Sequence, residues 1–171
     1  LNNNATMYKS APCSTFKMVS ATAGLMEGYI TTNSTFTCTG IFTTVTPSPK
    51  CWIYPRSHGS LNVSGAIENS CNYFFYQLGY NMSMVNNEYD ADAGLAVLAK
   101  YADLYGLSEK SGVEITEYAP DVSDELPIQS AIGQGTNNFS TVGLARYVTT
   151  IANNGTCYNL TLVDKITDRS G

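Results

Sequence analysis

The sequence predicts a mainly α-helical domain, and three observations support this fold class. With 171 residues, of which 43% are hydrophobic, the chain is long and apolar enough to form one core. Apolar side chains recur at helical spacing in four segments, and Gly or Asn follows most of these patterns. We find neither an internal repeat nor a long linker, so we treat residues 1–171 as a single domain.

The first half of the chain predicts one helix, an extended region and a broken helix. In residues 14–27 apolar side chains recur at i, i+3, i+7 and i+10, and a glycine follows. Residues 29–60 carry β-forming side chains and three prolines, which predict extended segments around 35–39 and 50–54 joined by turns. A helical pattern then starts at Val63, is interrupted over 69–72 by four poor helix formers, and resumes over 73–78 before Gly79.

Two further helices are predicted in the second half. Residues 91–105 place leucines, an alanine and tyrosines on one face, and a second stripe follows Ser140, which we interpret as an N-cap, and ends near residue 152. The intervening residues 111–139 look irregular and include a glycine-rich turn at 132–135. Residues 157–166 alternate loosely between apolar and polar types, which predicts the start of a strand.

Composition argues against nucleic-acid binding and against a membrane-spanning segment. The formal net charge is −5 and the sequence lacks a basic stripe, so we expect no nucleic-acid binding. Residues 28–49, the longest stretch without Asp, Glu, Lys or Arg, contain eight threonines and two prolines and do not predict a membrane span. Much of the polarity comes from 15 Asn, 16 Ser and 19 Thr, a composition that suits a protein outside the cytoplasm.

The five cysteines predict no metal site from their spacing. No pair forms a C-x-x-C motif, and the single histidine, His58, has no second histidine to accompany it, so we expect no zinc and interpret His58 as a structural hydrogen-bonding residue. Cys38 and Cys51 flank a loop rich in Thr and Pro. Either a disulfide or two reduced, buried thiols fits this placement, and the odd number of cysteines leaves at least one thiol unpaired.

The sharpest chemical feature is the run Ser14-Thr15-Phe16-Lys17. Ser14 and Lys17 lie three residues apart, so on a helix their side chains share one face. A lysine whose pKa is lowered by burial can take the hydroxyl proton and make the serine a nucleophile. The predicted helix start also supplies free N–H groups that stabilise an oxyanion. The alternative is an N-cap serine beside a solvated lysine.

A second polar motif lies in the predicted helix break. In Ser70-Cys71-Asn72 the serine can relay a proton to a leaving group, and the asparagine amide can bind a substrate carbonyl. The alternative is a polar helix junction in which both side chains cap the next helix.

Taken together, these motifs resemble the transpeptidase domain of penicillin-binding proteins, and most closely its class B, elongation-type members. The resemblance covers most of the chain and consists of Tyr8 with Pro12–Lys17, Cys51-Trp52 with His58-Gly59, Ala66–Phe75, Tyr105-Gly106-Leu107, Ile132–Gly135 and Ala145–Gly155. It implies an α+β fold in which a helical part packs against a five-stranded antiparallel sheet. Residues 1–171 would then be a partial transpeptidase domain, mainly the helical subdomain, with most of the sheet absent.

The resemblance also implies roles for four residues. Ser14 would be the acylated nucleophile, Lys17 its general base, Ser70 a proton shuttle and Asn72 a contact to the substrate amide, with neither a cofactor nor a metal. The sequence departs from the family at Cys13, where glycine is usual, and it lacks a downstream Lys-Thr-Gly motif. We therefore expect little or no transpeptidation by this chain alone.

For the parent protein the resemblance implies a peptidoglycan D,D-transpeptidase that cross-links the cell wall and contributes to cell shape. Its partners would be stem peptides ending in D-Ala-D-Ala, β-lactam antibiotics and a cell-wall glycosyltransferase of the elongation machinery. It would lie on the extracytoplasmic face of the bacterial membrane, held by an N-terminal anchor. Two alternatives are a β-lactamase-type serine hydrolase, for which the sequence lacks a Glu-x-x-Leu-Asn pattern, and a non-enzymatic β-lactam sensor or wall-binding module.

Overall fold

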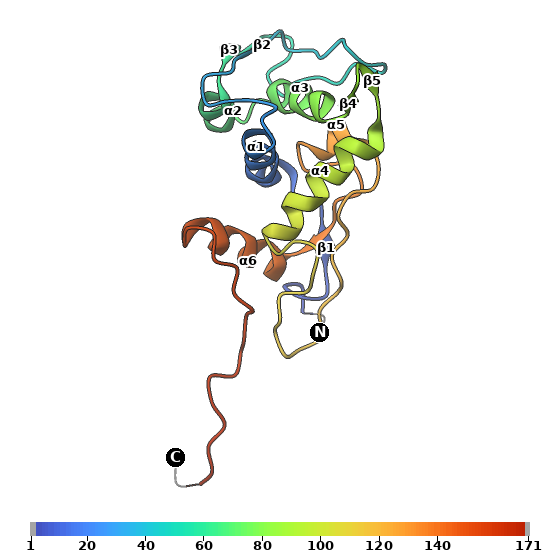
Figure 1. Ribbon diagram of the computed structural model, residues 1–171. Coiled ribbons are helices and arrows are strands. Elements are labelled where there is room, and N and C mark those ends of the chain that lie inside the picture. Colours follow the sequence, from blue (N-terminus) through green and yellow to red (C-terminus); the bar gives the residue numbers. More distant parts are fainter. Residues whose placement is uncertain (1–2, 170–171) are drawn as a thin grey trace.

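The computed structural model describes residues 3–169 and confirms the mainly α-helical class. Short antiparallel strand pairs connect helices (Figure 1). The helical elements are a 3-10 turn, η1 (Cys13–Phe16), and α1 (Lys17–Met26), α2 (Val63–Glu68), α3 (Asn72–Met82), α4 (Ala91–Leu104), α5 (Pro127–Ser130) and α6 (Thr141–Ala152). The strands are β1 (Lys9–Ser10), β2 (Phe36–Cys38), β3 (Gly59–Leu61), β4 (Met84–Val85), β5 (Glu88–Tyr89) and β6 (Phe139–Ser140), which pair as β1–β6, β2–β3 and β4–β5.

Helices α1 and α3 form the centre of the molecule. Helix α1 packs against α3 and α4, and α3 also packs against α5 and β2 (Figure 1). The largest buried side chains at this centre are aromatic: Phe16, Phe74 and Phe75 are each at most 1% exposed. All three belong to one hydrophobic core cluster, and because aromatic side chains bury the most apolar area per residue, this core stabilises the starts of both α1 and α3. The candidate site lies between these two helix starts.

Several sequence predictions are confirmed. The pattern over residues 14–27 corresponds to η1 followed by α1, and Gly28 follows with a φ of 76°. The pattern over 91–105 corresponds to α4. Ser140 caps α6, since its side chain accepts a hydrogen bond from the N–H of Gly143 at 3.0 Å.

Three sequence predictions are wrong: the extended segment over 50–54, the end of the helix at Gly79 and the strand over 157–166. Residues 50–54 form turns, with only an isolated bridge between Lys50 and Ile41, and the partner of β2 is β3. Helix α3 does not stop at Gly79 but continues to Met82, because tertiary packing outweighs the low helix propensity of glycine. The hairpin β4–β5 went unpredicted, although its Asn86-Asn87 turn has the positive φ values that such turns require.

Residues 157–166 also form no strand. Their start is held instead by Arg146 of α6, which is only 3% exposed. Its guanidinium donates to the carbonyl of Tyr158 at 2.7 Å and to the side chains of Asn159 and Glu109 at 2.9 Å each. A buried arginine satisfies these acceptors without a neighbouring strand, and beyond this point the chain runs away from the helices (Figure 1).

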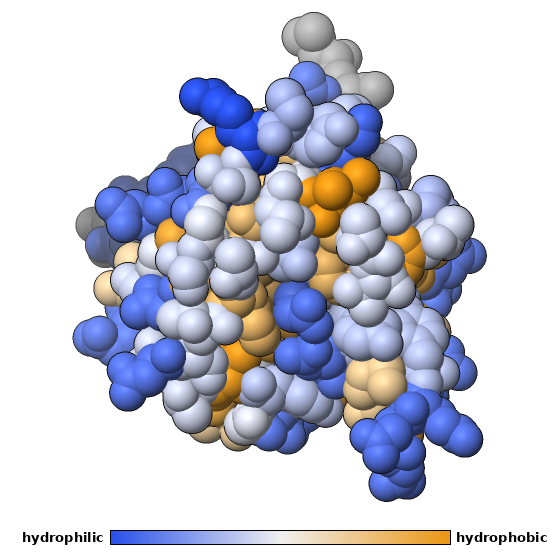
Figure 2. All heavy atoms as spheres, turned by 90° about the horizontal axis from the view of Figure 1, so that it is seen from above, coloured by the Kyte–Doolittle hydropathy of each residue, from blue (hydrophilic) through white to orange (hydrophobic). Residues whose placement is uncertain are grey.

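In Figure 2 most of the visible face is pale, with scattered hydrophilic residues and small apolar patches. Within residues 3–169, no helix has the length and hydropathy needed to cross a membrane.

Candidate active site

Ser14 lies inside the 3-10 turn η1, exposed to solvent, immediately before α1. The residue before it, Cys13, has a φ of 49°, which lies in the left-handed region that favours glycine. Glycine is also the residue that the resembled family usually has at this position. The N–H of Cys13 donates to the carbonyl of Gly133 at 3.0 Å, and the hydroxyl of Tyr147 donates to the carbonyl of Thr15 at 2.8 Å. Two distant segments therefore hold the turn that presents Ser14. Pro12, not Ser14, occupies the N-cap position of this turn.

Lys17 is the first residue of α1, and its side chain is 2% exposed. Its Nζ lies 3.0 Å from Ser14 Oγ, 3.0 Å from Ser70 Oγ, 2.8 Å from the Ser70 carbonyl and 2.6 Å from Asn72 Oδ1. Ser70 Oγ also donates to Ser14 Oγ at 3.0 Å. The amine therefore touches both serine hydroxyls at once, which is the geometry a shared proton carrier requires.

Burial changes the charge state of Lys17. Loss of solvent lowers the pKa of this amine to about 8, although negative charge on the nearby sulfurs of Cys51 and Cys71 opposes the shift. At pH 7 an amine with that pKa is neutral in roughly a tenth of molecules, compared with fewer than about one in a thousand for an ordinary lysine. A neutral Lys17 can accept the Ser14 proton, so the arrangement can generate a serine nucleophile.

The α2–α3 junction carries Ser70 and Asn72 to this amine. Ser70 has a φ of 48°, an uncommon conformation for a serine, and Asn72 is the first residue of α3. Cys71 between them is fully buried, and its N–H donates to the carbonyl of Ala66 at 2.8 Å. The helix–break–helix prediction is confirmed, and the break turns both polar side chains toward α1.

The structure thus brings together all four residues singled out in the sequence, Ser14, Lys17, Ser70 and Asn72. The sequence analysis placed Gly133 in a glycine-rich turn and Tyr147 in a helical segment, and it linked neither residue to the turn that carries Ser14. Both belong to stretches that resemble the family, but the sequence gives no signal that either reaches the turn before α1.

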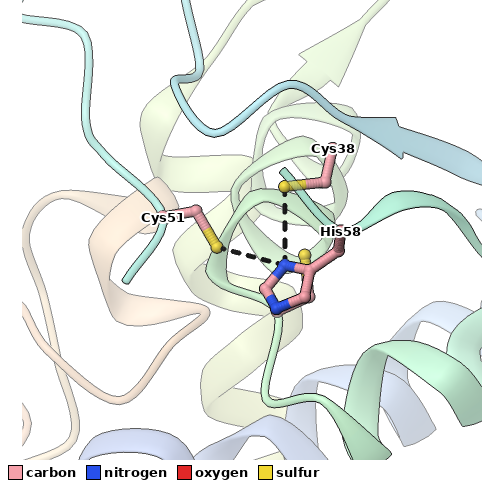
Figure 3. Close-up of side chains that lie close together, drawn as sticks. Cys38, Cys51 and His58 are labelled. Carbon is pink, nitrogen blue, oxygen red and sulfur yellow. Dashed lines mark hydrogen bonds between the residues drawn. The ribbon is translucent and has the colours of Figure 1, made fainter. Parts of the chain in front are cut away.

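A thiol–imidazole cluster lies next to the site and consists of Cys38, Cys51, His58 and Cys71. One ligand atom from each lies within 4.8 Å of all the others. His58 Nδ1 is 3.6 Å from the sulfurs of both Cys38 and Cys51. Figure 3 marks these two contacts with dashed lines. All five cysteines are free, and Cys38, Cys51 and Cys71 are buried, which agrees with the reduced-thiol alternative for Cys38 and Cys51.

The donor set of this cluster fits a metal ion. Three thiols and one imidazole are a common set at structural zinc sites, where four such ligands form a tetrahedron. The hydrogen bond between the two thiols lowers the pKa of Cys51 and raises the pKa of Cys71, so this pair favours a single thiolate, on Cys51. The expectation of no zinc site rested on chain spacing. The spacing of these residues along the chain does not reveal the cluster, because the four side chains come from separate loops and strand ends.

Comparison with known proteins agrees with the helical layout and the serine–lysine site. The family model of the penicillin binding protein transpeptidase domain matches residues 1–170, and the chain belongs to this family.

Among curated relatives, the chain is 30% identical over 128 residues to peptidoglycan D,D-transpeptidase MrdA of Escherichia coli strain K12, covering 68% of this chain and 17% of that protein. One solved structure is described as "Structural coordination of polymerization and crosslinking by a peptidoglycan synthase complex". It matches this chain with a TM-score of 0.82 and 29% identity, covering 95% of this chain and 28% of that one. A complex between penicillin-binding protein PBP2 and MreC from Helicobacter pylori shares the fold, with a TM-score of 0.82, 23% identity, and coverage of 97% and 32%. The chain therefore spans less than a third of the relative and of the first of these structures.

Proposed function

We propose that the complete protein containing this chain is a peptidoglycan D,D-transpeptidase that acts through an acyl-enzyme at Ser14. The observation that carries the proposal is the buried amine of Lys17, within 3.0 Å of the hydroxyls of both Ser14 and Ser70. Membership of the transpeptidase family and similarity to a relative named peptidoglycan D,D-transpeptidase support the same reaction class.

In the first half-reaction, neutral Lys17 removes the Ser14 proton as Ser14 Oγ attacks the carbonyl carbon of the D-Ala-D-Ala bond. The tetrahedral oxyanion receives a hydrogen bond from the Ser14 N–H at the start of the helical turn. As the C–N bond breaks, Ser70 passes a proton to the leaving nitrogen and is reprotonated by Lys17, so free D-Ala departs and the acyl group stays on Ser14. Asn72 contacts the substrate amide.

In the second half-reaction, an amine of another stem peptide attacks the acyl carbon and gives up a proton to the Lys17–Ser70 pair. Ser14 leaves with a proton, and the two stems are joined by a new amide. A β-lactam enters the first half-reaction alone, because its opened ring keeps the leaving nitrogen attached.

The partners we assign follow from this chemistry and from the relatives. Stem peptides are the acyl donor and acceptor, and β-lactams acylate the same serine. The two structural relatives, described with a peptidoglycan synthase complex and with MreC, support a partner in the elongation machinery such as a glycosyltransferase. We place the protein on the extracytoplasmic face of the membrane, anchored by an N-terminal segment, since peptidoglycan is cross-linked there.

Mapping of the acyl group tests the proposal. The complete protein is incubated with benzylpenicillin and digested with trypsin, which releases residues 10–17 as one peptide. We expect one penicilloyl group per chain, on Ser14, and its loss in the variant Ser14→Ala. An adduct on Cys13 or Ser70 would contradict the assignment of the nucleophile, and rapid release of hydrolysed penicillin would indicate a β-lactamase instead.

A further inference from the structure

We propose that the hydroxyl of Tyr147 positions the nucleophile: it binds the backbone between η1 and α1 and keeps the turn at Ser14 in its 3-10 form, which aligns Ser14 Oγ with the amine of Lys17. Tyr147 belongs to α6 and is 1% exposed. Its hydroxyl acts through the backbone of Thr15, which makes it a positioning residue and not a catalytic one. The inference rests on the proposed transpeptidase function and adds a residue that serves the same site.

A 3-10 hydrogen bond joins the backbones of the two reacting residues. The N–H of Lys17 donates to the carbonyl of Ser14, three residues earlier. In a 3-10 turn the side chains at i and i+3 eclipse one another, whereas in an α-helix they are offset around the axis by about 60°. The eclipsed arrangement brings the Ser14 hydroxyl into line with the Lys17 side chain, and the two groups lie 3.0 Å apart. This short distance therefore depends on the form of the turn.

The Tyr147 hydroxyl lies where the 3-10 turn changes into the α-helix. It donates to the carbonyl of Thr15 at 2.8 Å. In an uninterrupted α-helix this carbonyl would accept from the N–H of Val19. The backbone of Val19 hydrogen-bonds to the Tyr147 oxygen as well, so the hydroxyl bridges two groups that would otherwise bond to each other. A side chain that inserts into the backbone ladder is one of the usual causes of a break in helix geometry, and α1 begins only at Lys17.

Burial keeps the Tyr147 hydroxyl in the form that donates. Loss of solvent raises the pKa of Tyr147 well above its usual value, and electrostatic repulsion from Tyr105 raises it further, while the backbone hydrogen bond from Val19 opposes the rise. A tyrosine with a raised pKa stays protonated through the neutral and mildly basic range. Tyr147 therefore adds no titration of its own to the acylation reaction.

Packing holds the ring of Tyr147 in place. The ring of Tyr105 meets it edge-on, with centroids 5.4 Å apart and an interplanar angle of 85°. The Tyr105 hydroxyl in turn forms a 2.8 Å hydrogen bond with Thr22 Oγ1 of α1. The neighbouring Arg146 donates to two backbone carbonyls in the segment that follows α4, which anchors the same turn of α6. These contacts fix the distance between the Tyr147 hydroxyl and Thr15.

Acylation kinetics of Tyr147→Phe test the inference. Phenylalanine keeps the ring and removes only the hydroxyl. In the complete protein with a fluorescent penicillin, we expect the rate constant of the covalent step to fall roughly 10- to 100-fold, the penalty typical of a displaced reacting group, while the constant for reversible penicillin binding stays close to wild type. The pH midpoint of acylation should not move, because the Lys17 amine keeps its burial and its contacts with Ser70 and Asn72.

The variant Tyr101→Phe is the matched control. Tyr101 of α4 is 5% exposed, and its hydroxyl donates to Glu27 at 2.8 Å, at the opposite end of α1 from Ser14. The same substitution thus removes one hydroxyl contact from the same helix, away from the nucleophile. We expect a similar loss of thermal stability in both variants and wild-type acylation in Tyr101→Phe. Equal slowing in the two variants, or a Tyr147→Phe rate within a few-fold of wild type, would overturn the positioning role.

Hydrogen exchange supplies a measurement that does not require acylation. In Tyr147→Phe the amides of residues 15–19 should exchange faster than in wild type, because the turn loses a bond that fixes its form, and in Tyr101→Phe they should exchange as in wild type. Unchanged exchange over 15–19 in Tyr147→Phe would show that the hydroxyl does not hold the turn. If the wild-type protein is not acylated at all, the proposed function fails, and hydrogen exchange still decides whether Tyr147 fixes the turn.

Discussion

Replacing Lys17 by methionine should reduce the rate at which penicillin acylates Ser14 by roughly 10³-fold, within the usual range for loss of a general base. Within residues 3–169, the Lys17 amine is the only group with hydrogen bonds to both serine hydroxyls. Methionine fills a similar volume without a proton acceptor, so the loss reports proton transfer and not a cavity. The measurement is the second-order acylation rate constant of the complete protein, followed by stopped flow or gel fluorescence.

The matched control is Lys100→Met, which removes a lysine paired with Glu27 on the surface. Because an exposed ion pair contributes at most about 1 kcal/mol, this variant should acylate at the wild-type rate. If Lys17→Met acylates within a few-fold of wild type, another group activates Ser14 and the proposed mechanism is wrong.

Replacing Gly133 by alanine should damage both stability and acylation, because the backbone of the nucleophile turn occupies the space of the new methyl group. A Cβ at Gly133 would lie 2.0 Å from the carbonyl oxygen of Cys13 and 2.8 Å from Phe16 Cβ, and φ is +76°. Left-handed strain costs alanine about 1–2 kcal/mol and overpacking about 1–3 kcal/mol more. The turn at Ser14 must also shift, so we expect acylation to slow by at least about tenfold, a typical penalty for misplaced reactive groups.

Gly28 supplies a control with the same backbone conformation. Its φ is also +76°, but a Cβ there meets no atom within 4 Å. Gly28→Ala should therefore show the strain alone, with a stability loss of about 1–2 kcal/mol and wild-type acylation. Thermal unfolding and acylation rates measured on both variants separate the two costs. Equal acylation rates in the two variants would show that Gly133 does not support the turn.

The candidate site could be predicted because its chemistry is encoded locally. Ser14 and Lys17 share a helical face by spacing alone, and the poor helix formers around Ser70 mark a junction. The contact between the two motifs could not be derived from spacing. It depends on the packing of α1 against α3, and only resemblance to a family suggested it.

The thiol–imidazole cluster illustrates what the sequence hides. Its ligands lie at positions 38, 51, 58 and 71, with no close pair, and they meet because β2 pairs with β3 and the loop between them folds back. The sequence pattern over 50–54 favoured a strand, but Cys51 there takes part in a turn whose backbone bonds to Gly40. Long-range pairing decided this region, and local propensity could not.

The helices other than the four-residue α5, which lies in a region predicted to be irregular, were easier to predict because each buries one apolar stripe. Helix α4 and the start of α6 occur where the periodicity and the caps predicted them. The predicted strand over 157–166 is wrong because, within the part of the chain that the structure describes, no neighbouring strand pairs with this segment. Arg146 satisfies the start of that segment instead.

The pH dependence of acylation tests the central claim most directly, which is that a neutral Lys17 activates Ser14. Because burial lowers the pKa of Lys17 to about 8, the base is protonated and inactive at lower pH and gains activity as pH rises. We predict that the acylation rate constant of the complete protein increases about tenfold per pH unit between 6 and 7.5 and levels off above a midpoint near 8. A rate that is flat from pH 6 to 9, or one that still rises tenfold per unit at pH 10, would contradict this claim.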